Sequence, residues 1–237
     1  MTVSDEILKR SADSYRRIRN TMRFMLANMQ GFDPNKDLLS IDKMLILDQW
    51  IVSKTADLQS QVVNEYDEYN FHLAMKMILN FCTNDLGGFY LDIIKDRQYT
   101  TQTNSLARRS AQSALYHIAH AMVRWITPVL SFTAEEFWQY LPGASNESVF
   151  LQTWYEGLIG DFNNSAIDTA RDVNVHLRKE LEEMRRDKVI GSSLDAEVDI
   201  YCNDENYQAL RELKDELRFI FITSDARIHL LSEKPKE

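Results

Sequence analysis

Three arginines and one asparagine recur along one segment at a spacing that places them on the same side of a helix. They follow i, i+3, i+4, i+7 spacing and are Arg16, Arg19, Asn20 and Arg23, which we call the cationic stripe. A guanidinium can hold a phosphate through two hydrogen bonds or lie on an unstacked base, and an asparagine amide can read a base edge. The spacing therefore predicts a surface for an anionic partner.

The charge around the cationic stripe is opposite in sign to that of the whole chain. Between Lys9 and Arg23 there are six basic residues and one acid, a local balance of +5 in a chain whose net charge is −9. Solvated arginines that pair with acids on neighbouring helices would give a similar pattern. An acidic total argues against a nucleic-acid partner unless the basic residues are clustered, and here they are.

A second basic patch is predicted farther along the chain, where Asp96 is the only acid. Its members are Lys95, Arg97, Arg108 and Arg109. Pairing of Lys95 and Arg97 with Asp92 or Asp96 is an equally good interpretation.

No catalytic constellation is found in the sequence. His117 and His120 are three residues apart, but no third metal ligand of suitable placement is found after them, so core or capping roles are favoured. Glu135 and Glu136 are adjacent and therefore point to different sides of a helix. A glycine-rich phosphate loop and a nucleophile elbow are both absent.

Composition indicates a helical protein with a sizeable core. Of 237 residues, 44% are hydrophobic and 27% charged, and only 7 Gly and 4 Pro interrupt them. The first ten residues lack an apolar core of a signal sequence, and no long apolar run occurs in the remainder, so we expect no membrane association. Two widely separated cysteines favour a reducing, cytoplasmic location.

Hydrophobic periodicity predicts long helices joined by short links. The expected helices span residues 4–30, 40–66, 69–95, 104–126 and 133–140. In the first, Tyr15, Ile18, Met22 and Leu26 form an apolar seam beside the cationic stripe. Gly87 and Gly88 permit a kink in the third, and a capping box at Thr133 opens the last. Such helices pack as a roughly antiparallel bundle.

The character of the sequence changes near Gly157. Gly157, Gly160 and the pair Asn163 and Asn164 suggest a linker, and a highly charged helix is expected from Ala166 to Lys188. Alternation from Leu194 to Tyr201 predicts a half-buried strand. A helix at 204–217 and strands at 218–222 and 227–231 complete the expectation. We predict a mainly α protein, with a helical bundle at residues 1–157 and a small α+β module at 158–237.

Four ordered blocks resemble bacterial isoleucyl-tRNA synthetases, which are class I aminoacyl-tRNA synthetases. The blocks span residues 13–24 (DSYRRIRNTMRF), 89–99 (FYLDIIKDRQY), 127–136 (TPVLSFTAEE) and 190–198 (IGSSLDAEV). They cover most of the chain and resemble the anticodon-binding domain together with the segment on its C-terminal side. The sequence departs from the family pattern at Val173 to Arg178, within the charged helix.

The resemblance implies that this segment binds the anticodon stem-loop of tRNA(Ile), while other domains of the same polypeptide catalyse and edit aminoacylation. It implies RNA contacts for the cationic stripe, and secondarily for Lys95 and Arg97 at the end of the third helix. The His-Ile-Gly-His and Lys-Met-Ser-Lys-Ser signatures are absent from this sequence. ATP, Mg and a C-terminal zinc are therefore expected only of the full-length enzyme.

Two alternatives remain open on the sequence. Valyl-, leucyl- and methionyl-tRNA synthetases carry similar bundles. A helical scaffold that binds a protein partner through an apolar groove is a different class of function, and its binding would depend little on salt.

Overall fold

A computed structural model describes residues 3–160, 162 and 165–235, which form two compact units divided after Phe162. The sequence places the boundary between residues 157 and 158, and part of the predicted linker, Asn163 and Asn164, lies outside the described residues. Each unit is described by itself. The predicted class, mainly α with a small α+β module, is confirmed.

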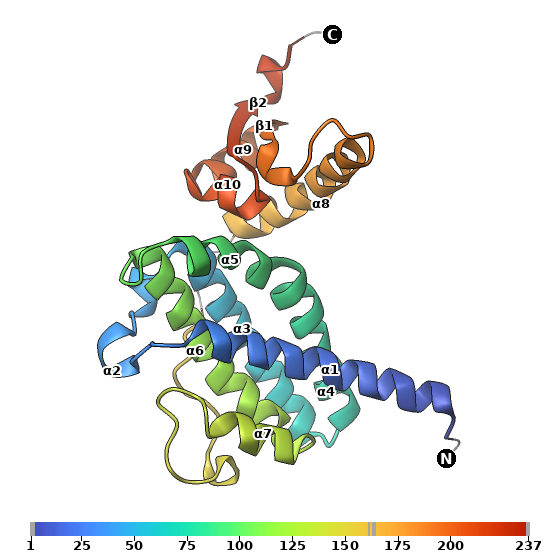
Figure 1. The fold of residues 1–237 in the computed structure, drawn as a ribbon, viewed down its shortest axis with the longest axis vertical. Helices are drawn as coiled ribbons and strands as arrows, with labels where there is room; N and C mark the ends of the chain where they lie inside the picture. The colour runs from blue at the N-terminus through green and yellow to red at the C-terminus, as the bar shows by residue number, and fades with distance from the viewer. Residues whose placement is uncertain (1–2, 161, 163–164, 236–237) are drawn as a thin grey trace. The chain divides into compact units, whose positions relative to one another are not determined.

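The first unit is a helical bundle (Figure 1). Its longer helices are α1 (Asp5–Asn28), α3 (Ile46–Asp67), α4 (Phe71–Asn80), α5 (Leu91–Thr100), α6 (Leu106–Ile126) and α7 (Ser131–Trp138). Shorter elements are α2 (Pro34–Asp37), η1 (Ile41–Lys43), the π-helix η2 (Phe81–Tyr90) and η3 (Val149–Leu151). Among the described residues, no helix combines the length and the apolar character needed to cross a membrane.

Helix α1 begins and buries its apolar side largely as the sequence predicts. Ser4 is its N-cap, and its hydroxyl accepts a hydrogen bond from the Ile7 amide at 3.3 Å. Ile18 and Met22 are buried, whereas Tyr15 at the same seam keeps 36% of its surface exposed. The seam therefore anchors the second half of α1, and the flank of the helix beside the seam stays accessible.

Helix α6 forms the centre of the bundle. It is buried along most of its length, and it contacts α3, α5, α1 and α7. Small residues such as Ala111, Ala114 and Ala121 are fully buried, which allows neighbouring helices to approach closely. Ser110 and Ser113 on the same helix accept hydrogen bonds from the Leu45 and Leu39 amides, and so hold the chain ahead of α3.

The glycine pair lies in a π-helix rather than at a sharp kink. A Cβ at Gly87 would stand 2.9 Å from the Cys82 carbonyl oxygen, and one at Gly88 would stand 3.1 Å from that of Thr83. These carbonyls lie five residues back, which is the spacing of π-helical hydrogen bonds. A Cβ at Gly87 would force the turn to shift, and one at Gly88 would make a tight contact, because the wide turn brings backbone against both positions.

Two predicted helix starts are wrong. Helix α3 begins at Ile46 instead of Ser40, because a 3-10 turn intervenes. Helix α7 begins at Ser131, and Thr133 does not cap it. The Glu135 carboxylate instead accepts hydrogen bonds from the Ser148 hydroxyl and the Val149 amide, so it secures the segment after the helix.

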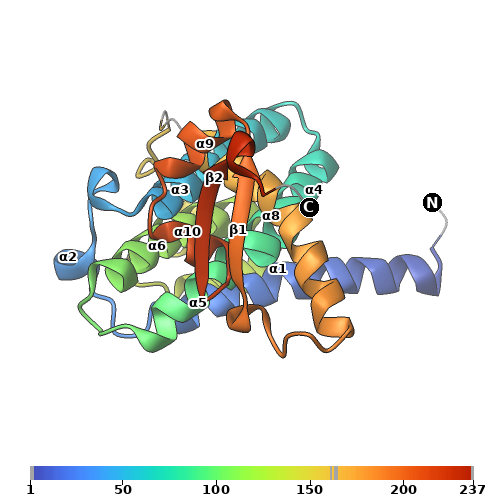
Figure 2. The ribbon, with the colours of Figure 1, turned by 90° about the horizontal axis from the view of Figure 1, so that it is seen from above.

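The second unit pairs two parallel strands with helices. Its elements are α8 (Ser165–Arg186), η4 (Ser193–Asp195), β1 (Glu197–Cys202), α9 (Asp204–Arg211), α10 (Glu216–Phe221), β2 (Asp225–Leu230) and η5 (Leu231–Glu233). Strands β1 and β2 lie side by side (Figure 2), with Glu197 opposite Asp225 and Cys202 opposite Leu230. Helices α9 and α10 make the crossover that parallel strands require.

The predicted strand at 218–222 is wrong, because this segment forms α10. Leu217, Ile220 and Phe221 are buried at i, i+3, i+4 spacing, which is helical. Ile222 then adopts a left-handed conformation with φ of 56° and ends the helix. The apolar run alone did not distinguish a short buried helix from a strand.

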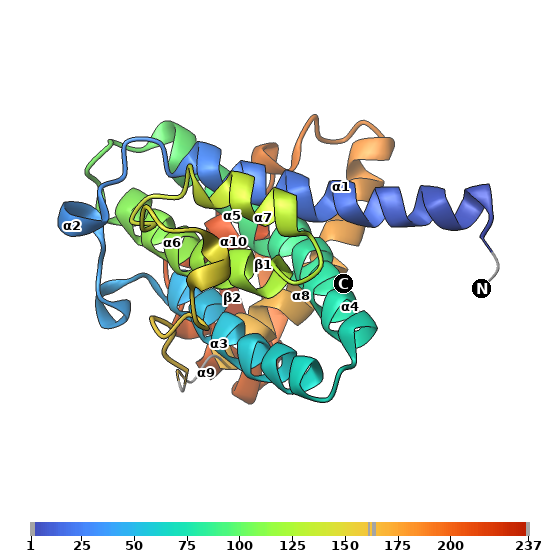
Figure 3. The ribbon, with the colours of Figure 1, turned by 90° about the horizontal axis from the view of Figure 1, so that it is seen from below.

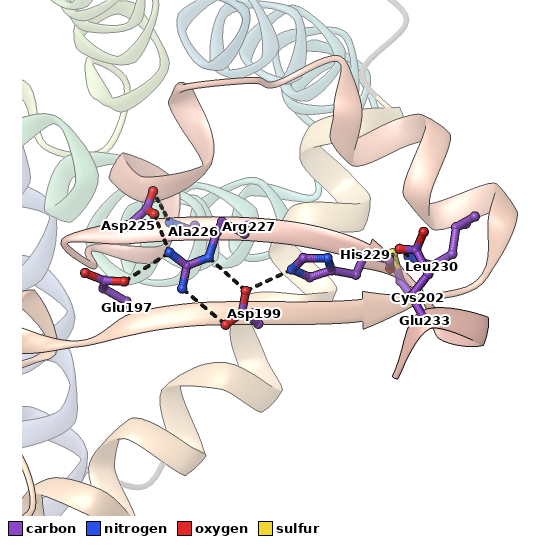
Figure 4. Close-up of polar contacts among 9 residues, drawn as sticks. All are labelled: Glu197, Asp199, Cys202, Asp225, Ala226, Arg227, His229, Leu230 and Glu233. Atoms are coloured by element: carbon purple, nitrogen blue, oxygen red, sulfur yellow. Dashed lines mark hydrogen bonds and ion pairs between the residues drawn. The ribbon is translucent and has the colours of Figure 1, made fainter. Parts of the chain in front are cut away.

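A charge cluster covers one face of the strand pair (Figure 4). Arg227 of β2 bonds to Glu197 and Asp199 of β1 and to Asp225 of its own strand, at 2.8 to 3.2 Å. His229 Nε2 lies 2.8 Å from the Asp199 carboxylate. Hydrogen bonds from Arg227 and His229 lower the pKa of Asp199 to about 2. The cluster therefore links the two strands across their exposed face.

Candidate nucleic-acid interface

The cationic stripe lies along α1, on the flank of its buried seam. Arg16, Asn20 and Arg23 are exposed and Arg19 is half-buried. Arg16 pairs with Asp13 at 3.2 Å. Within the described ranges, Arg19, Asn20 and Arg23 have no hydrogen bond or ion pair with another side chain, so the alternative of a paired helix face holds for Arg16 only.

Helix α7 lies beside α1 (Figure 3). A small cleft is lined by residues of α1 and of the α7 region. The cleft has a volume of about 70 Å³. Its lining, which defines the α1–α7 cleft, consists of Arg19, Met22, Arg23, Leu26, Thr133, Glu136, Phe137 and Tyr140. The Tyr15 hydroxyl of α1 lies 3.1 Å from that of Thr133, a lining residue from α7. Two members of the cationic stripe thus face a concave surface.

The structure contradicts the prediction that Arg97 contacts RNA. Only 1% of its surface is exposed, and its guanidinium lies 3.3 Å from the Asp48 carboxylate. Tyr90 and Ser110 donate hydrogen bonds to the same carboxylate. Burial raises the pKa of Asp48, and the Arg97 charge opposes that rise. Arg97 therefore joins α5 to α3 inside the bundle through Asp48.

Lys95 is exposed on α5 and donates a hydrogen bond to Asp92 at 2.8 Å. The alternative pairing predicted for it is therefore present. No residue of α5 lines the α1–α7 cleft. Lys95 thus stays a separate candidate contact, which the fold does not bring into the α1–α7 cleft.

The predicted second basic patch does not form a continuous cationic surface. Arg109 pairs with Asp37 at 3.2 Å and also donates to Gln112 and Asn104. Its side chain is only 13% exposed. Together with the burial of Arg97, this leaves the cationic stripe as the clustered candidate interface of the first unit, with Lys95 as a separate candidate contact.

His117 and His120 have structural partners, in agreement with the interpretation favoured by the sequence. His117 Nδ1 lies 2.8 Å from the Tyr155 hydroxyl, and His120 Nε2 lies 2.9 Å from the Pro142 carbonyl oxygen. Burial lowers the pKa of each histidine to about 4. Across the part of the chain that the structure describes, no three His, Cys, Asp or Glu side chains gather as a metal site.

Sequence reasoning missed three exposed residues of the α7 region. Phe132 is 94% exposed, Tyr140 is 71% exposed, and Glu136 is exposed between them. Phe132 and Glu136 are four residues apart and so lie on one side of α7, whereas Tyr140 follows the end of the helix at Trp138. The signal was present in the sequence, but the capping box assigned to Thr133 placed Phe132 outside the helix and gave the adjacent acids a structural role.

The segment that departs from the family pattern, residues 173–178, has one buried side chain, Asn174, while Val175 and His176 are exposed. Asn174 of α8 is 3% exposed, and its amide nitrogen lies 3.5 Å from the Ile220 carbonyl oxygen of α10. Asn174 is therefore part of the packing of α8 against α10 and offers no surface to RNA.

Comparisons with known proteins agree on one family. The model of the anticodon-binding domain of tRNA ligase matches residues 48–200, which is more than half of the chain. The matched segment includes α7, whereas the cationic stripe precedes it.

Curated relatives are isoleucine–tRNA ligases. The chain is 64% identical over 234 residues to that of Ruthia magnifica, an alignment that covers 99% of this chain and 25% of the relative. It is 55% identical over 242 residues to that of Nitrosococcus oceani, an alignment that covers 100% of this chain and 26% of the relative. The chain thus spans about a quarter of the length of these relatives. On the extent of the family match, the chain belongs to the anticodon-binding domain family of tRNA ligases.

Proposed function

We propose that this chain is the tRNA-binding segment of an isoleucine–tRNA ligase and that α1 binds the anticodon stem-loop of tRNA(Ile). The family match and the names of the curated relatives support this proposal. The observation that carries the assignment of the surface is the cationic stripe, in which Arg19, Asn20 and Arg23 have no partner within the described residues.

The distribution of charge favours RNA binding at α1. The body of the protein is acidic, with a net charge of −9, so RNA is repelled from most of its surface. Guanidinium groups with no protein partner can exchange water and counterions for phosphates when RNA binds. One basic surface on an acidic body gives orientation as well as attraction.

We further propose that catalytic and editing domains of the same polypeptide act on the tRNA that this segment holds, in the cytoplasm. ATP, Mg and zinc would belong to those other parts. The His-Ile-Gly-His and Lys-Met-Ser-Lys-Ser signatures, to which the resemblance assigns adenylate formation, are absent from this sequence. The purified chain should therefore show no isoleucine-dependent exchange between pyrophosphate and ATP.

Direct binding tests the proposal. Fluorescence anisotropy with labelled tRNA(Ile) should show binding that weakens steeply as salt rises from about 50 to about 200 mM, because counterions are released from each neutralised phosphate. A tRNA with an altered anticodon should bind less tightly. Affinity that does not change with salt, or no affinity for tRNA, would favour a scaffold that binds a protein through an apolar groove.

A further inference from the structure

The α1–α7 cleft combines three kinds of group that suit an unstacked nucleotide. Its base is apolar, because Met22 and Phe137 are 1% and 5% exposed. Its rim carries two guanidinium groups, Arg19 and Arg23, and a single carboxylate, Glu136. The Tyr140 ring, 71% exposed, stands at the same rim.

The charged groups of the α1–α7 cleft are not used by the protein itself. Arg19, Arg23 and Glu136 line one small space, yet among the described residues they make no ion pair within 4.0 Å and no hydrogen bond. By contrast, Glu135 on the same helix is held by Ser148 and Val149. The difference between these adjacent acids separates a structural carboxylate from one that is free to accept from a ligand.

An ionised carboxylate accepts hydrogen bonds and cannot donate one. It therefore selects a base edge that carries N–H donors. The Watson–Crick edge of guanine presents two adjacent donors, N1–H and the N2 amino group, which match the two oxygens of one carboxylate. Adenine and cytosine present one amino donor beside a ring nitrogen whose lone pair would face the second oxygen. Uracil presents one imino donor between two carbonyl oxygens.

We propose that the α1–α7 cleft receives the edge of an unstacked guanine, with Glu136 as its specificity-determining residue and Tyr140 as its stacking surface. This inference rests on the proposed function. A volume of about 70 Å³ is small beside a nucleotide, so the base edge enters while the ring lies against Tyr140 at the mouth. Arg19 and Arg23 hold the phosphates on either side of the base.

The experiment uses the full 237-residue chain and RNA hairpins that are identical except at one loop base. Each loop guanosine is replaced in turn by inosine, which lacks the N2 amino group and thus one donor. For one loop position, inosine should weaken binding to the parent chain by roughly 10- to 150-fold, the range of one lost hydrogen bond to a charged group. With Glu136→Gln, the same replacement should change affinity far less.

Two further variants complete the design. Tyr140→Ala should weaken binding of guanosine and inosine hairpins equally, by roughly 5- to 150-fold, because stacking does not depend on the base edge. Glu68→Gln is the matched control. Glu68 is an exposed acid next to the end of α3, so its substitution makes the same change of charge outside the cleft. It should leave the guanosine preference intact.

The outcomes distinguish failure of the guanine site from failure of the proposed tRNA-binding function. If Glu136→Gln strengthens binding of every hairpin to the same extent, Glu136 only repels phosphate and the guanine site is wrong, while the tRNA-binding function stands. If Glu136→Gln and the parent chain discriminate equally between guanosine and inosine hairpins, the guanine site is also wrong and the tRNA-binding function again stands. If the parent chain binds no hairpin, the proposed function itself fails.

Discussion

Arg97 Nη1 lies 3.3 Å from Asp48 Oδ2, and the two side chains keep only 2% and 0% of their surface exposed. This ion pair joins α5 to α3, and Ser110 of α6 bonds to the same carboxylate. It explains why a segment that looks basic in the sequence does not form a basic surface. Through Ser110 the pair is also tied to α6, on which α1 packs.

Arg97→Ala should destabilise the first unit strongly. The substitution leaves the Asp48 carboxylate buried without its cation, which typically costs about 3–5 kcal/mol. Urea unfolding followed by circular dichroism measures the change. Lys95→Ala is the control, because its exposed pair with Asp92 should contribute less than about 1 kcal/mol. Equal effects of the two variants would show that Arg97 is not needed inside the bundle.

Stability should fall between about pH 6.5 and about pH 4 because of the two buried histidines. Burial lowers the pKa of His117 and of His120 to about 4 in the folded chain, from the ordinary value of 6.5. In this window the unfolded chain binds protons that the folded chain does not, so the free energy of unfolding decreases as the pH falls. Below about pH 4 both states are protonated and this loss is complete.

His117→Asn should reduce the pH slope in that window by about 1.4 kcal/mol per pH unit, the contribution of one proton. The slope is the informative quantity, because a packing defect lowers stability at every pH alike. His72→Gln is the matched control, since His72 is exposed. An unchanged slope for His117→Asn would mean that His117 is protonated as easily in the folded chain as in the unfolded one.

Gly87→Ala should destabilise the π-helix. The new Cβ would stand 2.9 Å from the Cys82 carbonyl oxygen, a backbone atom that cannot move without disturbing the turn. A loss of about 1–3 kcal/mol is expected, the range for a forced fit into packed structure. Gly160→Ala is the control, because a Cβ there meets its nearest neighbour at 3.9 Å. Equal unfolding midpoints for the two variants would contradict the close approach.

The sequence predicted helix positions and buried faces well where they depend on nearby residues. The Ser4 cap, the seam containing Ile18 and Met22, and the burial of α6 follow from hydrogen-bonding capacity and helical periodicity. These features depend on neighbours within one or two turns of the chain, which a sequence displays directly.

Features that depend on distant partners were not predictable in the same way. Whether Arg97 is exposed depends on Asp48, which is 49 residues away and belongs to another helix. The α1–α7 cleft likewise requires that Arg19 and Glu136 come together from two helices. Charge patterns show which residues carry charge, and only the fold shows which charges meet.

Comparing Arg19→Ala with Arg17→Ala tests most directly whether the cationic stripe binds tRNA. Both residues belong to α1, but Arg19 lines the α1–α7 cleft whereas the exposed Arg17 does not. The measurement is the affinity for tRNA(Ile) as a function of salt. Arg19→Ala should lose about 1–3 kcal/mol of binding free energy, and Arg17→Ala much less.

The salt dependence identifies the group that Arg19 contacts. A phosphate contact predicts that Arg19→Ala reduces the salt slope by about one unit, whereas a base contact leaves the slope nearly unchanged and weakens discrimination against altered anticodons. If Arg19→Ala and Arg17→Ala bind tRNA(Ile) as tightly as the parent chain at every salt concentration, the cationic stripe is a solvated helix face and the assigned interface is wrong.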